Sequence, residues 1–244
     1  MKNSAENISG SLEKYLKRLS FNDHVVLHNF ENGKSPPGEI MIKTSSAEDE
    51  VTQRDLGGFD LDSLEMAVSE CRECELHKTR NNTVFGSGNR SSSIVFIGEA
   101  PGRDEDLQGV PFVGRAGKLL DKIIEAIGFS REDIYIANIL KCRPPGNRDP
   151  KEDEVEKCEG YLAAQLKLID PVLICAMGRI AAQNLLKTKA SLKVLREDIH
   201  YYNGIKVVVT YHPAALLRNP GFKRPTWEDM KLLRRLYDEA LEAR

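Results

Sequence analysis

Four of the five cysteines stand where their spacing bears on metal binding. Cys71 and Cys74 form a C-x2-C pair, and Cys142 and Cys158 follow much further along the chain. Cys175 lies inside the apolar run VLICAM and is interpreted as a buried strand residue without chemistry. In a reducing compartment, four cysteines from three separate segments indicate a metal site rather than disulfides. Zinc usually takes two C-x2-C pairs whereas iron–sulfur clusters accept scattered thiolates, so the spacing alone leaves the metal open.

A glycine-rich loop is the second feature with chemical potential. Residues 98–102 read GEAPG directly after an apolar run, and Phe112 follows within PFVG. Such turns often bind phosphate through backbone N–H groups, but neither a P-loop nor a G-x-G-x-x-G pattern is present. Loops this long in compact domains tend to be functional. Phe112 is therefore either a core residue or a platform on which a ring stacks.

A histidine follows the last apolar run of the chain. His212 begins the segment HPAALLRNP, in which Leu216, Leu217 and Arg218 follow without a core period. A single histidine at a strand end is usually only hydrogen-bonded. Leucines on a strand-end loop are costly to expose unless they meet a partner, so this segment is a candidate contact surface.

Short β-branched runs alternate with helical patterns from residue 61 onward. This alternation predicts an α/β fold with a mainly parallel sheet covered on both faces. Ligands bind such sheets at the carboxyl ends of the strands, where both loops above begin. Asn203-Gly204 between the last two runs predicts a type I′ hairpin. The expected strands are 94–97, 134–139, 172–176, 194–202 and 205–210, and the expected helices are 62–68, 116–127, 151–168, 179–186 and 227–243.

Composition sets the class of protein. The 244 residues carry 35 basic and 37 acidic side chains, a formal charge of −2, so any nucleic-acid contact must be local rather than a basic coat. Apolar runs are too short to span a bilayer and the start has no apolar signal region, so we expect a cytoplasmic protein. Residues 1–60 read as a poorly ordered extension, with one short helix at 11–19, a disordered linker and a candidate surface for a protein partner. Residues 61–244 form the folded domain.

Four motifs together resemble one known family. CREC, GEAPGRDEDLQGVPFVGRAGKLLD, ANILKCRPPGNR and HPAALLRNP occur in order and closely resemble the family 4 uracil-DNA glycosylases over residues 61–244. The resemblance implies a three-layer α/β/α sandwich with the central sheet of that family. It also implies a [4Fe–4S] cluster, held by Cys71, Cys74, Cys142 and Cys158.

The resemblance implies an activity as well. Such enzymes flip deoxyuridine out of single- or double-stranded DNA and hydrolyse its N-glycosidic bond, which releases uracil and leaves an abasic site. Phe112 would stack on uracil, Asn138 would read its edge, and His212 would hydrogen-bond O2 as negative charge develops there. The substrate slot would be completed by Glu99, Ala100 and Gly102.

Other roles are hypotheses. Better-known members of the wider superfamily orient the attacking water with an aspartate and exclude thymine with a tyrosine, where this chain has Ala100 and Gly102. We therefore assign the water to Glu105, which lies in the same loop. Leu216 is expected to fill the space left by the flipped base, and Arg218 to bind phosphate. We expect a monomer.

Two rival readings remain. In the first, the chain is a non-catalytic iron–sulfur module that grips a flipped or single-stranded base and releases no uracil. In the second, zinc holds the cysteines together and the protein is a scaffold for partners through its N-terminal segment.

Overall fold

The computed structural model describes residues 58–242, so the predicted helix at 11–19 and nearly all of the extension lie outside the described residues. The sheet has the order β1-β3-β2-β4-β6-β5. Its four central strands are parallel, and the short edge strands β1 and β5 are antiparallel to their neighbours. The strands are β1 (Ser87–Gly88), β2 (Ile94–Gly98), β3 (Tyr135–Asn138), β4 (Leu173–Met177), β5 (His200–Tyr202) and β6 (Ile205–Thr210).

The central strands are apolar on both faces because helices cover both. Along β2, Val95 and Ile97 enter the core on one side of the sheet, while Ile94 and Phe96 enter the core on the other. Every residue of β2, β3 and β4 is buried. This continuous burial is typical of a parallel sheet with helices on both faces.

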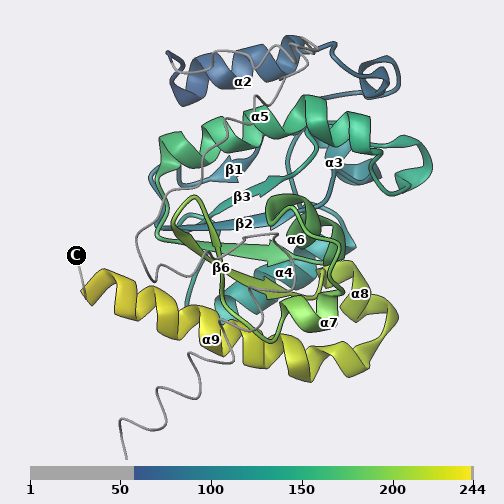
Figure 1. Ribbon diagram of the computed structural model, residues 1–244. Helices are drawn as coiled ribbons and strands as arrows, with labels where there is room; N and C mark the ends of the chain where they lie inside the picture. The colour runs from purple at the N-terminus through teal and green to yellow at the C-terminus, as the bar shows by residue number, and fades with distance from the viewer. Residues whose placement is uncertain (1–57, 243–244) are drawn as a thin grey trace, which may run out of the picture. The chain divides into compact units, whose positions relative to one another are not determined.

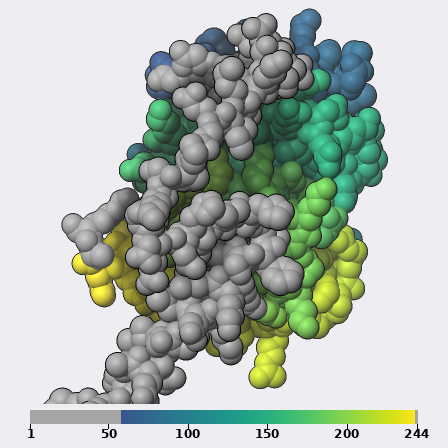
Figure 2. All heavy atoms as spheres, in the orientation of Figure 1, coloured from purple at the N-terminus to yellow at the C-terminus, as the bar shows by residue number. Residues whose placement is uncertain are grey.

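The helices form the outer layers of a three-layer α/β/α sandwich (Figure 1). Helices α2, α5 and α6 contribute to one core, and α4 and α9 to the other. Figure 2 shows the blue atoms of the first described residues at the top of the view and the yellow atoms of the last ones toward the bottom. None of the helices within residues 58–242 has the length and apolar character needed to cross a bilayer. The helices are α2 (Leu61–Glu70), α3 (Arg103–Gln108), α4 (Arg115–Ala126), α5 (Glu152–Ile169), α6 (Arg179–Leu185), α7 (Leu192–Leu195), α8 (Pro213–Arg218) and α9 (Lys223–Glu242), with 3-10 turns at Glu75–Lys78, Pro145–Asn147 and Pro220–Phe222.

The predicted fold class is confirmed, and so is the hairpin: Asn203 and Gly204 have φ angles of 48° and 85°, as a type I′ turn requires. The predicted strand at 194–202 is wrong over residues 194–199. The Ser191 hydroxyl accepts a hydrogen bond from the Val194 N–H and begins α7, so that only His200–Tyr202 pairs with β6.

Two segments expected as loops contain helices. Helix α3 lies within the long loop after β2 and is capped by Gly109, whose φ of 72° suits a left-handed cap. Helix α8 follows His212, and Pro213 occupies its first turn, where the missing N–H costs nothing. Both candidate loops are therefore held by regular structure close to the strand ends.

Candidate active site and cysteine cluster

The carboxyl ends of the parallel strands surround a cleft of about 910 Å³. Register explains why residues distant in sequence meet there, because Gly98 pairs with Asn138 and Met177 pairs with Thr210. Helices α3, α4, α6 and α8 all begin at this edge. The structure brings together in this cleft Glu99, Ala100, Gly102, Glu105, Phe112, Asn138, His212 and Arg218 of the residues predicted from sequence.

Asn138 presents a buried acceptor that lacks a partner. Its side chain is 2% exposed, and its Oδ1 receives no hydrogen bond from the residues of 58–242. A Cβ on Gly98 would lie 2.4 Å from that oxygen and 2.7 Å from Cζ of Phe112, so only glycine fits between them. Buried acceptors are normally satisfied, and an unsatisfied one in a cleft indicates that a ligand donates to it.

Phe112 is buried in an unusual conformation. Its φ is 53°, in the left-handed region that bulky residues avoid. Its ring centroid lies 5.5 Å from that of His212, with 33° between the planes. A Cβ on Gly117 would lie 1.7 Å from the Phe112 carbonyl oxygen. Only a glycine at position 117 therefore lets α4 approach this loop so closely. The sequence left core and platform open for Phe112, and the ring is both buried and in the cleft.

Glu105 holds the loop that carries Phe112. Its Oε1 accepts hydrogen bonds from the N–H groups of Val113 and Gly114, both at 3.0 Å. The carboxylate thus has a structural task that the sequence did not indicate. Its assignment to the attacking water stays a prediction.

His212 is a neutral hydrogen-bond donor in this environment. Its Nδ1 accepts a hydrogen bond from the Ala214 N–H at 3.1 Å, so the proton of the neutral ring resides on Nε2. Burial, and then the positive charge of Arg218, lower the pKa of His212 to about 4. The imidazole is therefore uncharged at neutral pH and keeps one N–H free to donate to a ligand.

Glu99 titrates near neutrality. Burial raises the pKa of Glu99 to about 7; the negative charge of Asp149 adds to the shift, and the positive charge of Arg179 opposes it. Arg179 and Asp149 are themselves an ion pair, with Nη2 and Oδ2 2.9 Å apart. A perturbed carboxyl in a cleft is typical of functional sites.

The two leucines of α8 point differently. Leu216 is buried at 3% exposure, whereas Leu217 is 42% exposed. Insertion of Leu216 into DNA would therefore require α8 to shift, because the side chain belongs to the packed interior of this conformation. Its assignment stays a prediction, and Leu217 is the leucine that solvent reaches.

A stacked assembly that sequence reasoning missed holds the His212 segment. Tyr211 lies flat against Phe222, with centroids 4.2 Å apart and 8° between the planes, and the Arg196 guanidinium covers its ring at 4.3 Å. Arg196 also makes two 2.8 Å hydrogen bonds to Asp229, which accepts a third from Thr210 Oγ1 at 2.7 Å. These contacts are between side chains distant in sequence, so no local pattern signals them.

The four cysteines predicted as metal ligands line one cavity between α2, α5 and the segment after β3. Arg80 Nη1 donates to Cys142 Sγ at 3.2 Å, and the Lys141 N–H donates to Cys158 Sγ at 3.4 Å. All five cysteines are free thiols, and Cys175 is buried within β4 as predicted. Within residues 58–242, no three His, Cys, Asp or Glu side chains form an arrangement that would hold a single metal ion.

Proteins of one known family are similar to most of this chain. The sequence model described as the uracil DNA glycosylase superfamily matches residues 85–231. A type-4 uracil-DNA glycosylase of Archaeoglobus fulgidus is 47% identical over 180 residues, which are 70% of this chain and 90% of that protein. Proteins of the same name are 46% identical in Saccharolobus solfataricus (181 residues, 70% of this chain and 83% of that protein) and 46% identical in Thermotoga maritima (168 residues, 67% and 88%). The chain belongs to the uracil-DNA glycosylase superfamily, and within it to the type-4 family.

Proposed function

We propose that this protein takes a flipped deoxyuridine of DNA into the cleft and hydrolyses its N-glycosidic bond, which releases uracil and leaves an abasic site. The observation that carries the proposal is the buried, unpaired Oδ1 of Asn138 beside the ring of Phe112. A flat base that stacks on the ring and donates an N–H to this oxygen would satisfy both. Release of free uracil from a deoxyuridine oligonucleotide tests the proposal directly.

Asn138 supplies base specificity. The amide oxygen accepts from uracil N3–H while the amide nitrogen donates to uracil O4. Cytosine presents the reverse pattern, with a bare N3 and an amine at the O4 position. Each buried polar group left unpaired costs about 1–3 kcal/mol, which is sufficient to decide between the two bases.

His212 stabilises the leaving group. Cleavage of the bond places negative charge on uracil O2 and positive charge on the sugar. The Nε2–H of the neutral ring, fixed by the hydrogen bond at Nδ1, donates to that oxygen as the charge grows. A water molecule then attacks C1′ of the sugar.

The cysteine cavity suits an iron–sulfur cluster. Cys71, Cys74, Cys142 and Cys158 supply four sulfurs to one cavity, and two N–H groups already donate to two of them. A [4Fe–4S] cluster bound there would join α2 to α5 and serve the fold rather than the reaction.

The cluster can be tested independently of activity. We expect Cys158→Ala to lose most of its iron and its visible absorption, since one ligand of four is removed. Cys175→Ala, in which a fully buried cysteine of β4 is shortened, should keep both. Iron analysis and the absorption spectrum are the measurements. Stoichiometric zinc in a colourless wild-type protein would instead support the zinc reading.

Glu105→Gln separates the two roles of Glu105. The amide oxygen can still accept from Val113 and Gly114, so the loop should stay in place and the melting temperature should change little. Loss of the negative charge should lower the single-turnover rate if this residue orients the attacking water. An undiminished rate would limit Glu105 to holding the loop.

Glu99 makes stability depend on pH. The native protein retains a proton on Glu99 up to about pH 7, which the unfolded chain releases near 4.5. The free energy of unfolding therefore falls as the pH rises from 4.5 to 7 and stays lower above it. As the pH rises from 5 to 8, the free energy of unfolding of Glu99→Gln should rise by about 1–2 kcal/mol relative to that of wild type. The full pKa shift would give more, but water in the cleft screens part of it.

Urea unfolding at the two pH values measures this gain. Glu125→Gln, on the exposed face of α4, is the control and should follow wild type at both. If Glu99→Gln also follows wild type, Glu99 does not carry the proton.

A further inference from the structure

We propose that Arg131 is a positioning residue for the uracil-stacking ring, because it fixes the backbone of Phe112 in its left-handed conformation. The inference rests on the proposed function, in which uracil stacks on the ring of Phe112. Arg131 does not line the cleft. Its contact nearest to the stacking ring is the hydrogen bond to the Phe112 carbonyl.

The conformation of Phe112 needs external support. A bulky side chain at a φ of 53° is strained, and such backbone persists only where its surroundings determine it. Glu105 binds the N–H groups that follow Phe112, so one side of the loop is held. The carbonyl groups of Pro111 and Phe112 cannot be satisfied by the Glu105 carboxylate, which only accepts hydrogen bonds, so they need their own partner.

Arg131 is that partner. Its Nη1 donates to the Pro111 carbonyl at 3.2 Å, and its Nη2 donates to the Phe112 carbonyl. Its Nε donates to Asp121 Oδ1 on α4 at 2.6 Å. One planar guanidinium thus binds two consecutive carbonyls and one carboxylate, a geometry that the flexible ammonium of lysine cannot reproduce.

The position of Arg131 is itself fixed. It follows Ser130 in the turn between α4 and β3, where the Ser130 N–H donates to Asp133 Oδ2 at 2.7 Å. The Arg131 side chain is 29% exposed, so it is partly shielded from water where it meets Asp121. The loop is therefore held on both sides: Glu105 binds its amide hydrogens and Arg131 binds its carbonyl oxygens.

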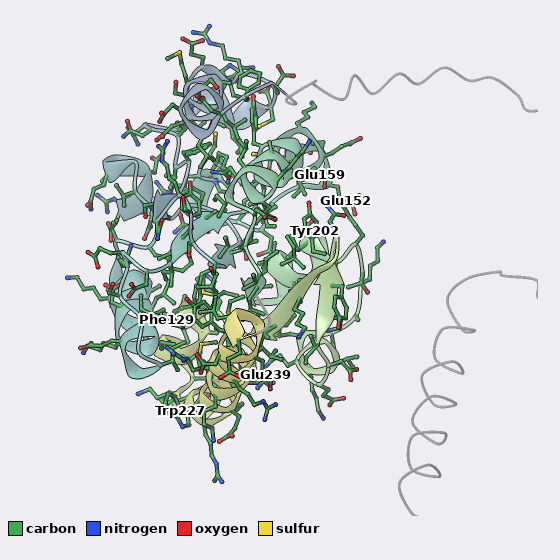
Figure 3. The ribbon with its side chains drawn as sticks, turned by 90° about the vertical axis from the view of Figure 1, so that its left-hand side faces the viewer. Phe129, Glu152, Glu159, Tyr202, Trp227 and Glu239 are labelled. Carbon is green, nitrogen blue, oxygen red and sulfur yellow. The ribbon has the colours of Figure 1, made fainter. Side chains whose placement is uncertain are left out.

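The test compares Arg131→Met with a matched variant, Arg234→Met. Arg234 likewise donates to a backbone carbonyl, that of Ile127 at 3.2 Å, and to a carboxylate, Asp238 at 3.0 Å. It covers the ring of Phe129, the residue labelled beside α9 in Figure 3, and it does not line the cleft. Both variants should lose stability, but only Arg131→Met should lose affinity for uracil.

The readouts are the melting temperature, the dissociation constant of free uracil, and KM with the single-turnover rate on a deoxyuridine oligonucleotide. We expect Arg131→Met to weaken uracil binding and lower kcat/KM by about 10- to 100-fold, as misplacement of a binding group does. Arg131→Lys should recover part of the loss. Asp121→Asn keeps Arg131 and removes the carboxylate that Arg131 binds, so it should show a smaller loss of uracil affinity and of kcat/KM. If Arg131→Met does not fold, Asp121→Asn takes its place in the test.

A double-mutant cycle completes the test. In a Phe112→Ala background, Arg131→Met should change uracil affinity less than twofold, because the ring it positions is gone. If Arg131→Met and Asp121→Asn bind uracil as wild type and Arg234→Met do, the proposal is overturned while the glycosylase stands. If wild type releases no uracil, the proposed function fails, and this inference fails with it.

Discussion

Asn138→Ala should lower kcat/KM for uracil release about 1,000-fold, because both polar groups on one edge of uracil lose their partner. The amide of Asn138 is 2% exposed, so water does not readily take its place. Residual uracil affinity should come from stacking on Phe112, which is worth about 1–3 kcal/mol per base. The measurements are steady-state kinetics and free-uracil binding.

Asn89→Ala is the control for this variant. Asn89 lies at the opposite end of β3, where its Oδ1 accepts from the Ser91 N–H at 2.9 Å, and its loss should leave kcat/KM within twofold. Asn138→Ala with wild-type kinetics would show that the buried oxygen is not the uracil reader, whatever its lack of a partner suggests.

His212→Ala should lower the single-turnover rate about 100- to 1,000-fold, the usual cost of one donor aimed at developing charge. Affinity for free uracil should fall much less, since the hydrogen bond to O2 strengthens only as the bond breaks. Because the pKa of His212 is about 4, the ring stays neutral from pH 8 down to 5. The ratio of wild-type to variant rates should therefore be constant over that interval.

His200→Ala is the matched control. His200 contacts the Leu195 carbonyl through Nε2 at 2.7 Å, on β5 at the edge of the sheet, and should not affect the rate. A ratio that falls tenfold between pH 7 and pH 5.5 would mean that His212 becomes charged there, contrary to the environment that the structure gives it.

The placement of the site was predictable because it follows from sheet geometry. Apolar runs ending in Gly98 and Asn138 predict parallel neighbours, and parallel strands bring their ends to one edge. Composition and spacing predicted Cys71, Cys142 and Cys158 as metal ligands; they line one cavity, and their binding of a metal stays a prediction. In both cases the residue types and their spacing along the chain carry the information.

What the sequence did not reveal depends on packing between distant segments. Nothing in the residues around Arg131 indicates that it binds the carbonyl of Phe112, because α4 and the following turn set that contact. The choice between Leu216 and Leu217 as the exposed leucine depends on how α8 lies against the domain. Only the β-branched pattern was visible at 194–202, so the helix begun by Ser191 was missed.

Release of free uracil by the purified protein, with its metal retained, tests the account most directly. A single-stranded oligonucleotide with one deoxyuridine and a matched one with deoxycytidine would be incubated under single-turnover conditions, and free base and alkali-labile sites counted. We predict one uracil and one alkali-labile site for each deoxyuridine, and neither product from the deoxycytidine strand. Binding of the deoxyuridine strand without either product would contradict the account and identify a module that grips a flipped base but leaves its bond intact.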